Sequence, residues 1–246
     1  MNRRQFIARA ATVGATVTLP STHPLMADTT TTAAVKGIPT ENYRLKPPES
    51  GLIRVAVVIS EGVNVIDLSG PWGVFESTLL PDSSGAMAKM AFELFTVSDT
   101  TDIVSSGTGL RLLPNYSFAN VPAPHVVVIP AQRGSDTMRD WLRKVSETAD
   151  VTMSVCTGAF HLARAGLLDG RIATTHHQFF DKLEKQHPKV MVKRGVRFVE
   201  GERISTAGGL TSGTDLALRV VERYFGREVA QGAADYMEYQ GSGWIV

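Results

Sequence analysis

Cysteine is nearly absent from this chain of 246 residues, which contains only one, Cys156. A single cysteine forms no internal disulfide, so the fold must be held by its hydrophobic core. An excess of charge of one sign is also missing, because 25 Lys and Arg residues face 24 Asp and Glu residues. That balance favours no nucleic-acid partner. The 43% of hydrophobic residues are enough for a sizeable core.

No long hydrophobic run is present at the N-terminus, although the segment MNRRQFIARAATVGATVTLPSTHPLMA is mildly apolar. Arg3 and Arg4 precede its Ala, Thr and Val residues, so residues 1–27 resemble a bacterial twin-arginine signal peptide. The segment is too short and too polar for a permanent span, which needs about 20 apolar residues, so we expect no stable membrane insertion. A basic, frayed terminus is the alternative. On the signal interpretation, the mature protein is periplasmic.

The composition changes near residue 51. Residues 28–50 are polar, contain proline and lack periodicity, which predicts a linker or a surface-wrapping arm. Residues 51–246 alternate apolar runs with helical patterns. The runs IRVAVVI (53–59), HVVVIP (125–130) and VTMSV (151–155) are typical of strands buried on both faces of a parallel sheet. Strands that alternate with helices predict an α/β domain with a mainly parallel central sheet and helices on both faces.

Single residues and short motifs predict where several helices and hairpins lie. Ser69, followed by Pro71, predicts a helix over residues 69–80, and Ser135 predicts the cap of another. A helix is expected over TGAFHLARAGLL, directly after Cys156. The segments IVSSGTGLRLLPN and RFVEGERISTA are interpreted as hairpins, and SGTDLALRVVERYF and REVAQGAADYMEY as two C-terminal helices.

Cys156 lies where the strand VTMSV ends and the helix begins. Sites in open α/β sheets lie at the carboxyl ends of strands. Thr157, Gly158 and Ala159 are small enough for a sharp turn like the nucleophile elbow of hydrolases. Because a helix N-terminus favours negative charge, this position predicts a lowered pKa for the thiol. A buried, inert cysteine is the alternative.

Three segments carry a family resemblance: VAVVISEGVNVIDLSGPWGVFE, SVCTGAFHLARAGLLDGRIATTH and ISTAGGLTSGTDLAL. They resemble the first strand with its acidic loop, the cysteine elbow and the late hairpin of the ThiJ/PfpI superfamily, which includes the DJ-1-like proteins and has the class I glutamine amidotransferase-like fold. Within that superfamily, the segments resemble more specifically the isocyanide hydratases and the sensor domains of AraC-type regulators. The resemblance implies a flavodoxin-like three-layer sandwich, a ThiJ/PfpI-like domain over residues 51–246 and a homodimer.

The resemblance also implies site residues. Asp67 stands where the hydratase branch has an acidic residue that points at the cysteine sulfur; a helix cap is its alternative role. A carboxyl facing a thiolate should have a raised pKa. Thr157 stands where several PfpI-like proteases have His, which disfavours a peptidase, and its backbone N–H is expected in an oxyanion hole.

Three further residues are candidates for auxiliary roles. Ala131 and Gln132 replace the Gly-Gly that relatives often have after the third strand, and Gln132 is expected to reach the pocket. His176 stands where the superfamily often has a histidine near the nucleophile; a structural histidine at a helix start is the alternative. His161 and His177 are expected at the surface or in an interface. No metal site is predicted, because no third ligand has recognisable spacing, and no cofactor is expected.

These residues predict a cysteine-dependent enzyme that acts on a small electrophile, with hydration of an isocyanide to an N-substituted formamide as the specific hypothesis. Two alternatives stay open. One is a small-molecule binding or sensor protein without catalysis, which export and a chain without a helix-turn-helix module disfavour. The other is a stress-response protein whose thiol is oxidised reversibly.

Replacing Arg3 and Arg4 with Lys should stop export if residues 1–27 act as a twin-arginine signal. Cell fractionation of the producing bacterium measures the outcome, with the wild-type chain as the control. Full recovery of the double variant in the periplasm would reject the signal interpretation.

Overall fold

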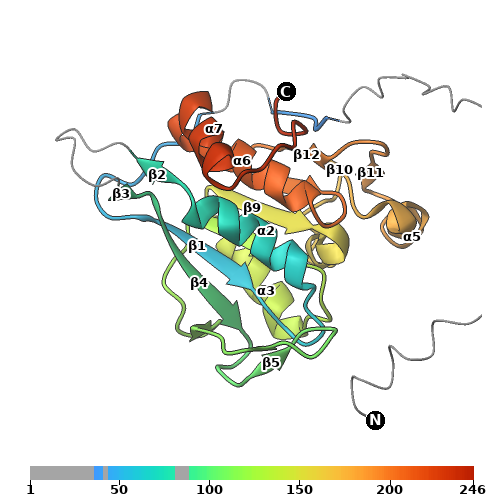
Figure 1. Ribbon diagram of the computed structural model, residues 1–246. Helices are drawn as coiled ribbons and strands as arrows, with labels where there is room; N and C mark the ends of the chain where they lie inside the picture. The colour runs from blue at the N-terminus through green and yellow to red at the C-terminus, as the bar shows by residue number, and fades with distance from the viewer. Residues whose placement is uncertain (1–35, 41–43, 81–88) are drawn as a thin grey trace, which may run out of the picture. The chain divides into compact units, whose positions relative to one another are not determined.

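A seven-stranded sheet forms the centre of the protein (Figure 1). The computed structural model describes residues 36–40, 44–80 and 89–246. The strands of the sheet are β1 (Ile53–Val58), β4 (Phe92–Ser98), β7 (Tyr116–Ser117), β8 (Val126–Ile129), β9 (Val151–Val155), β12 (Phe198–Val199) and β13 (Ile204–Ala207). Their order is β12-β13-β9-β8-β1-β4-β7, and every neighbouring pair is parallel except β12 with β13.

Helices cover both faces of this sheet, so the predicted flavodoxin-like three-layer sandwich is confirmed. Residues of α2, α6 and α7 pack on one face, and residues of α3, α4 and α5 pack on the other. The helices are α2 (Val65–Glu76), α3 (Asp136–Val145), α4 (Ala159–Arg164), α5 (Phe180–Gln186), α6 (Ser212–Phe225) and α7 (Arg227–Tyr236).

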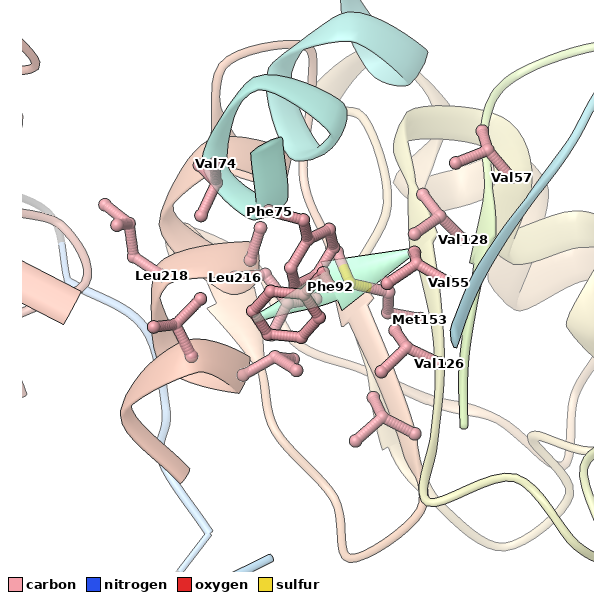
Figure 2. Close-up of a cluster of buried hydrophobic side chains, with 14 of the residues drawn as sticks. Val55, Val57, Val74, Phe75, Phe92, Val126, Val128, Met153, Leu216 and Leu218 are labelled. Atoms are coloured by element: carbon pink, nitrogen blue, oxygen red, sulfur yellow. The ribbon is translucent and has the colours of Figure 1, made fainter. Parts of the chain in front are cut away.

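The side chains of β1 alternate between the two helical layers. Val55 and Val57 belong to the core beneath α2 and α6, whereas Ala56 and Val58 belong to the core beneath α3 and α4. This alternation explains why the run is apolar at every position, since both faces of the strand are buried. Figure 2 shows the first of these cores, in which sheet and helix side chains meet: Val55, Val57, Phe92, Val126, Val128, Met153, Val74, Phe75, Leu216 and Leu218.

The prediction that the first helix runs from Ser69 to residue 80 is wrong. α2 begins four residues earlier, because the Asn64 side chain caps it by accepting the backbone N–H of Ile66 at 3.2 Å. Pro71 therefore lies inside the helix, where its missing N–H removes one backbone bond. The helix ends at Glu76, and its residues Val74 and Phe75 are fully buried. Burial of this face stabilises the helix across the proline.

The connections contain three small strand pairs. β5 (Val104–Ser105) and β6 (Arg111–Leu112) form the first predicted hairpin, whereas the second predicted hairpin is the pair β12 and β13 within the central sheet. The C-terminal residues 79–80 of the expected first helix instead form a strand, β2 (Leu79–Leu80), which pairs with β3 (Lys89–Met90). β10 (Ile172–Ala173) pairs in parallel with β11 (Met191–Val192).

Residues 36–40 lie along the outer edge of β12. The N–H of Ile38 donates to the Phe198 carbonyl at 2.8 Å, and the Ile38 carbonyl accepts from the N–H of Glu200 at 2.8 Å. A Cβ atom at Gly37 would lie only 2.1 Å from the Phe198 ring, so glycine lets the segment rest against that ring. The segment covers a sheet edge that would otherwise present unpaired backbone groups. Residues 1–35, which include the expected signal peptide, lie outside the described residues.

In the described part of the chain, no helix combines the length and the hydropathy needed to cross a bilayer.

Candidate functional site

Cys156 occupies a strained turn between β9 and α4. Its φ of 59° lies in the left-handed region, which a non-glycine residue rarely adopts. Hydrogen bonds on both sides hold this backbone, because the Cys156 N–H donates to the Gly208 carbonyl at 2.7 Å and the Thr175 hydroxyl donates to the Cys156 carbonyl at 2.8 Å. The predicted sharp turn is therefore present.

The turn also requires glycine two residues later. A Cβ atom at Gly158 would lie 2.0 Å from the carbonyl oxygen of Ile129, at the end of β8. The chain therefore passes directly over the end of the neighbouring strand. The predicted helix after the cysteine is correspondingly shorter than expected: a 3₁₀ turn spans Cys156–Gly158, and α4 ends at Arg164, two residues before Gly166 with φ of 79°.

Asp67 lies in the first turn of α2 and faces the thiol. Its side chain is fully buried, and its Oδ2 accepts the backbone N–H of Ala131 at 3.2 Å. The carboxyl and the Cys156 thiol lie close enough to shift each other's pKa, and the buried Asp67 Oδ1 has no hydrogen-bond partner among the described residues. Burial raises the pKa of Asp67 to about 6, against the lowering effects of the Ala131 N–H, the thiol and the Leu210 N–H. Asp67 does not cap the helix, since Asn64 does.

The prediction that Cys156 has a lowered pKa is wrong. Burial, with only 7% of the residue exposed, and the negative charge of Asp67 raise the pKa of the thiol to about 11. The N–H groups of Thr157 and Leu210 favour the thiolate, but they do not offset those two causes. The helix-terminus argument failed because it omitted desolvation of the sulfur and the like charge beside it. Near neutral pH the thiol is therefore protonated and lies beside the Asp67 carboxylate.

Ala131 and Gln132 lie on the loop after β8, and their contribution to the site comes mainly from this position. The Ala131 carbonyl accepts the N–H of Asn64 at 2.8 Å, while its N–H is directed at Asp67. The loop thereby joins the cap of α2 to the acidic residue. The Gln132 side chain donates to the Val58 carbonyl at 3.0 Å, and Gln132 lines a cavity together with Thr157.

Leu210 is a site residue that sequence reasoning missed. Its N–H acts on both Asp67 and Cys156, and its φ is 51°. Leu210 is thus another non-glycine residue in the left-handed region, and it presents a backbone donor to Asp67 and Cys156, which we call the reactive pair. The preceding Gly208 and Gly209 are the sequence signal that could have pointed to this turn.

The hydrogen bonds of His161 and His176 go to groups other than the thiol. His176 accepts the N–H of Gln178 at 3.3 Å and stacks on His177, with ring centroids 4.3 Å apart. These contacts fit the structural alternative for His176; among the described residues it has no hydrogen bond to Cys156. The expectation that His161 lies at the surface is wrong, because it is 1% exposed and its Nε2 lies 3.0 Å from the Gln132 carbonyl. Burial lowers its pKa to about 4, so it is neutral.

A group of three His, Cys, Asp or Glu side chains suited to a metal ion is not found within residues 36–40, 44–80 and 89–246.

A cysteine in a left-handed strand-to-helix turn, faced by a buried carboxyl on the first helix of an α/β sandwich, defines the class of the protein. The chain belongs to the DJ-1/PfpI family, whose model matches residues 53–223.

Individual relatives narrow the position of the chain within this family. The chain is 31% identical over 193 residues to the isonitrile hydratase of Pseudomonas putida, a match that covers 76% of this chain and 78% of the hydratase. It is 34% identical over 101 residues to the HTH-type transcriptional regulator CdhR of Pseudomonas aeruginosa, covering 41% of this chain and 30% of the regulator. A ThiJ/PfpI family protein from Pseudomonas syringae superposes with a TM-score of 0.67 at 24% identity, covering 91% of this chain and 82% of that one.

Replacement of Asp67 with Asn should lower the pKa of Cys156, because the like charge beside the sulfur is removed. The pH dependence of iodoacetamide alkylation measures this pKa. We expect a wild-type inflection near 11 and an inflection at lower pH for Asp67→Asn, whereas the exposed-site control Asp102→Asn should match the wild type. A wild-type inflection at or below the free-thiol value of about 8.5 would contradict the raised pKa.

Proposed function

We propose that the protein is a cysteine-dependent hydratase that converts an isocyanide into an N-substituted formamide. The observation that carries the proposal is the buried contact between the Asp67 carboxyl and the Cys156 thiol, which places a proton acceptor against a nucleophile. The 31% identity to isonitrile hydratase supports the choice of substrate class.

The raised pKa values assign the starting protonation state. With the pKa of Asp67 near 6 and that of Cys156 near 11, the carboxylate is mostly ionised and the thiol is protonated at neutral pH. Asp67 is therefore a base in the first step. It takes the thiol proton while sulfur bonds to the terminal carbon of the isocyanide, and the same proton then passes to that carbon. The adduct is a thioimidate on Cys156.

Water completes the reaction. It adds to the thioimidate carbon, the substrate nitrogen gains a proton, and the carbon–sulfur bond breaks to release the formamide. The leaving sulfur regains its proton, so the enzyme returns to its starting state and one water is consumed per turnover. The N–H groups of Thr157 and Leu210 stabilise negative charge on sulfur during both steps.

A sensor without catalysis is the second candidate. The relation to a transcriptional regulator favours it, although the chain spans less than a third of that regulator. A thiol-based stress protein is less favoured, because the raised pKa of Cys156 reduces the thiolate that oxidants attack. We further propose a homodimer and a periplasmic location, which rest on the family resemblance and on the sequence of residues 1–27.

If the proposal holds, wild type should convert alkyl isocyanides to formamides, and Asp67→Asn should lower kcat by about 10²–10⁴ with little change in KM. Loss of the isocyanide infrared band, with gain of the formamide carbonyl band and of formamide signals in the NMR spectrum, measures turnover. Cys156→Ser should abolish it, and Asp102→Asn should leave it unchanged. Near-native turnover by Asp67→Asn would reject the proton-transfer role, and tight binding without turnover by wild type would favour the sensor.

A further inference from the structure

A cavity of about 170 Å³ opens beside Thr157, the residue that follows Cys156. Thr157, which follows the cysteine, and Gln132, which follows Ala131, form its inner wall. Its outer wall comes from α4, α5 and the 3₁₀ turn between β10 and α5 (His177–Phe179). The volume equals that of about five or six water molecules at about 30 Å³ each, so it suits a small organic group.

Two cations line the outer wall of this cavity. The Arg164 guanidinium carbon lies 5.9 Å from the centre of the Phe160 ring, and the Lys182 Nζ lies 5.9 Å from the centres of both the Phe160 and the Phe179 rings. The rings themselves meet edge to face at 6.4 Å. The cationic heads are therefore placed over an aromatic floor, an arrangement that holds their long side chains near the cavity.

Within the part of the chain that the structure describes, no acidic side chain lines the cavity to neutralise these cations. The acidic residues of α5, Asp181 and Glu184, both pair with Arg194. Among the described residues, neither Arg164 nor Lys182 has an ion-pair partner. His161 also lines the cavity, but it is neutral because burial lowers its pKa to about 4, so it adds no competing charge.

We propose that this cationic cavity, defined by Arg164, Lys182, Phe160 and Phe179, binds a carboxylate carried by the small molecule that meets Cys156. The substrate class is then an isocyanide, or another small electrophile, with a carboxylate a few bonds from the reacting carbon. This inference deepens the proposed function and rests on it for the identity of the reacting group. Binding of the carboxylate itself requires only the cavity and its two cations.

Protection of the thiol tests the cavity without turnover. In low-salt buffer, where surface charges are least screened, roughly 20 mM butyrate should slow iodoacetamide alkylation of Cys156 about threefold, and butyramide should not. The double variant Arg164→Gln with Lys182→Gln should lose this protection. Lys185→Gln, which removes a charge from α5 outside the cavity, should keep it. Equal effects of butyrate and butyramide on wild type would overturn the inference, as would full protection of the double variant.

A substrate comparison separates this inference from the hydratase proposal. We expect kcat/KM for an isocyano carboxylate to exceed that for its methyl ester by about threefold to tenfold, and the double variant to erase the difference. Butyrate protection without turnover of any isocyanide would reject the hydratase and keep the cavity as an anion site. Equal turnover of acid and ester, without butyrate protection, would keep the hydratase and reject the cavity's role.

Discussion

The contact between a buried carboxyl and a buried thiol is the interaction on which the site depends. A lone charge in that position is costly, and two like charges are costlier, so the Asp67–Cys156 pair retains one proton at neutral pH. Burial raises both pKa values; the negative charge of Asp67 raises that of Cys156 further, whereas the thiol lowers that of Asp67. A proton held between an acceptor and a nucleophile is ready to move when sulfur forms a bond, which makes the pair chemically useful despite the cost of burial.

The surrounding fold keeps these two side chains together. Asp67 is presented by α2, whose cap at Asn64 is tied to the loop after β8 through the Ala131 carbonyl. Cys156 is presented by the turn after β9, and Gly158 lets that turn pass over the end of β8. Because β8 lies between β1 and β9 in the sheet, its end lies near both elements: Ala131, after β8, donates to Asp67, and the Ile129 carbonyl lies against Gly158. The same loop continues to Gln132, which connects the reactive pair to the cationic cavity.

Sequence reasoning predicted the parts of this arrangement that depend on burial patterns. The apolar runs of β1, β8 and β9 and the Ser135 cap of α3 could be read directly, because each follows from local chemistry. The start of α2 could not, since Asn64 and Ser69 are similarly good caps and only the packing of the helix decides between them. The burial of His161 on α4 could not be predicted either, because it depends on neighbours that are distant in sequence. The raised thiol pKa likewise arises from tertiary burial, which no local motif encodes.

The carbon-13 NMR shift of the Asp67 carboxyl, followed from about pH 3 to about pH 9 and assigned by its absence in Asp67→Asn, tests the central claim most directly. The proton-sharing account predicts a midpoint near pH 6 in the wild type. A midpoint at or below the ordinary value of 3.8 would contradict it, because the carboxyl would then be too weak a base to take the proton of the thiol.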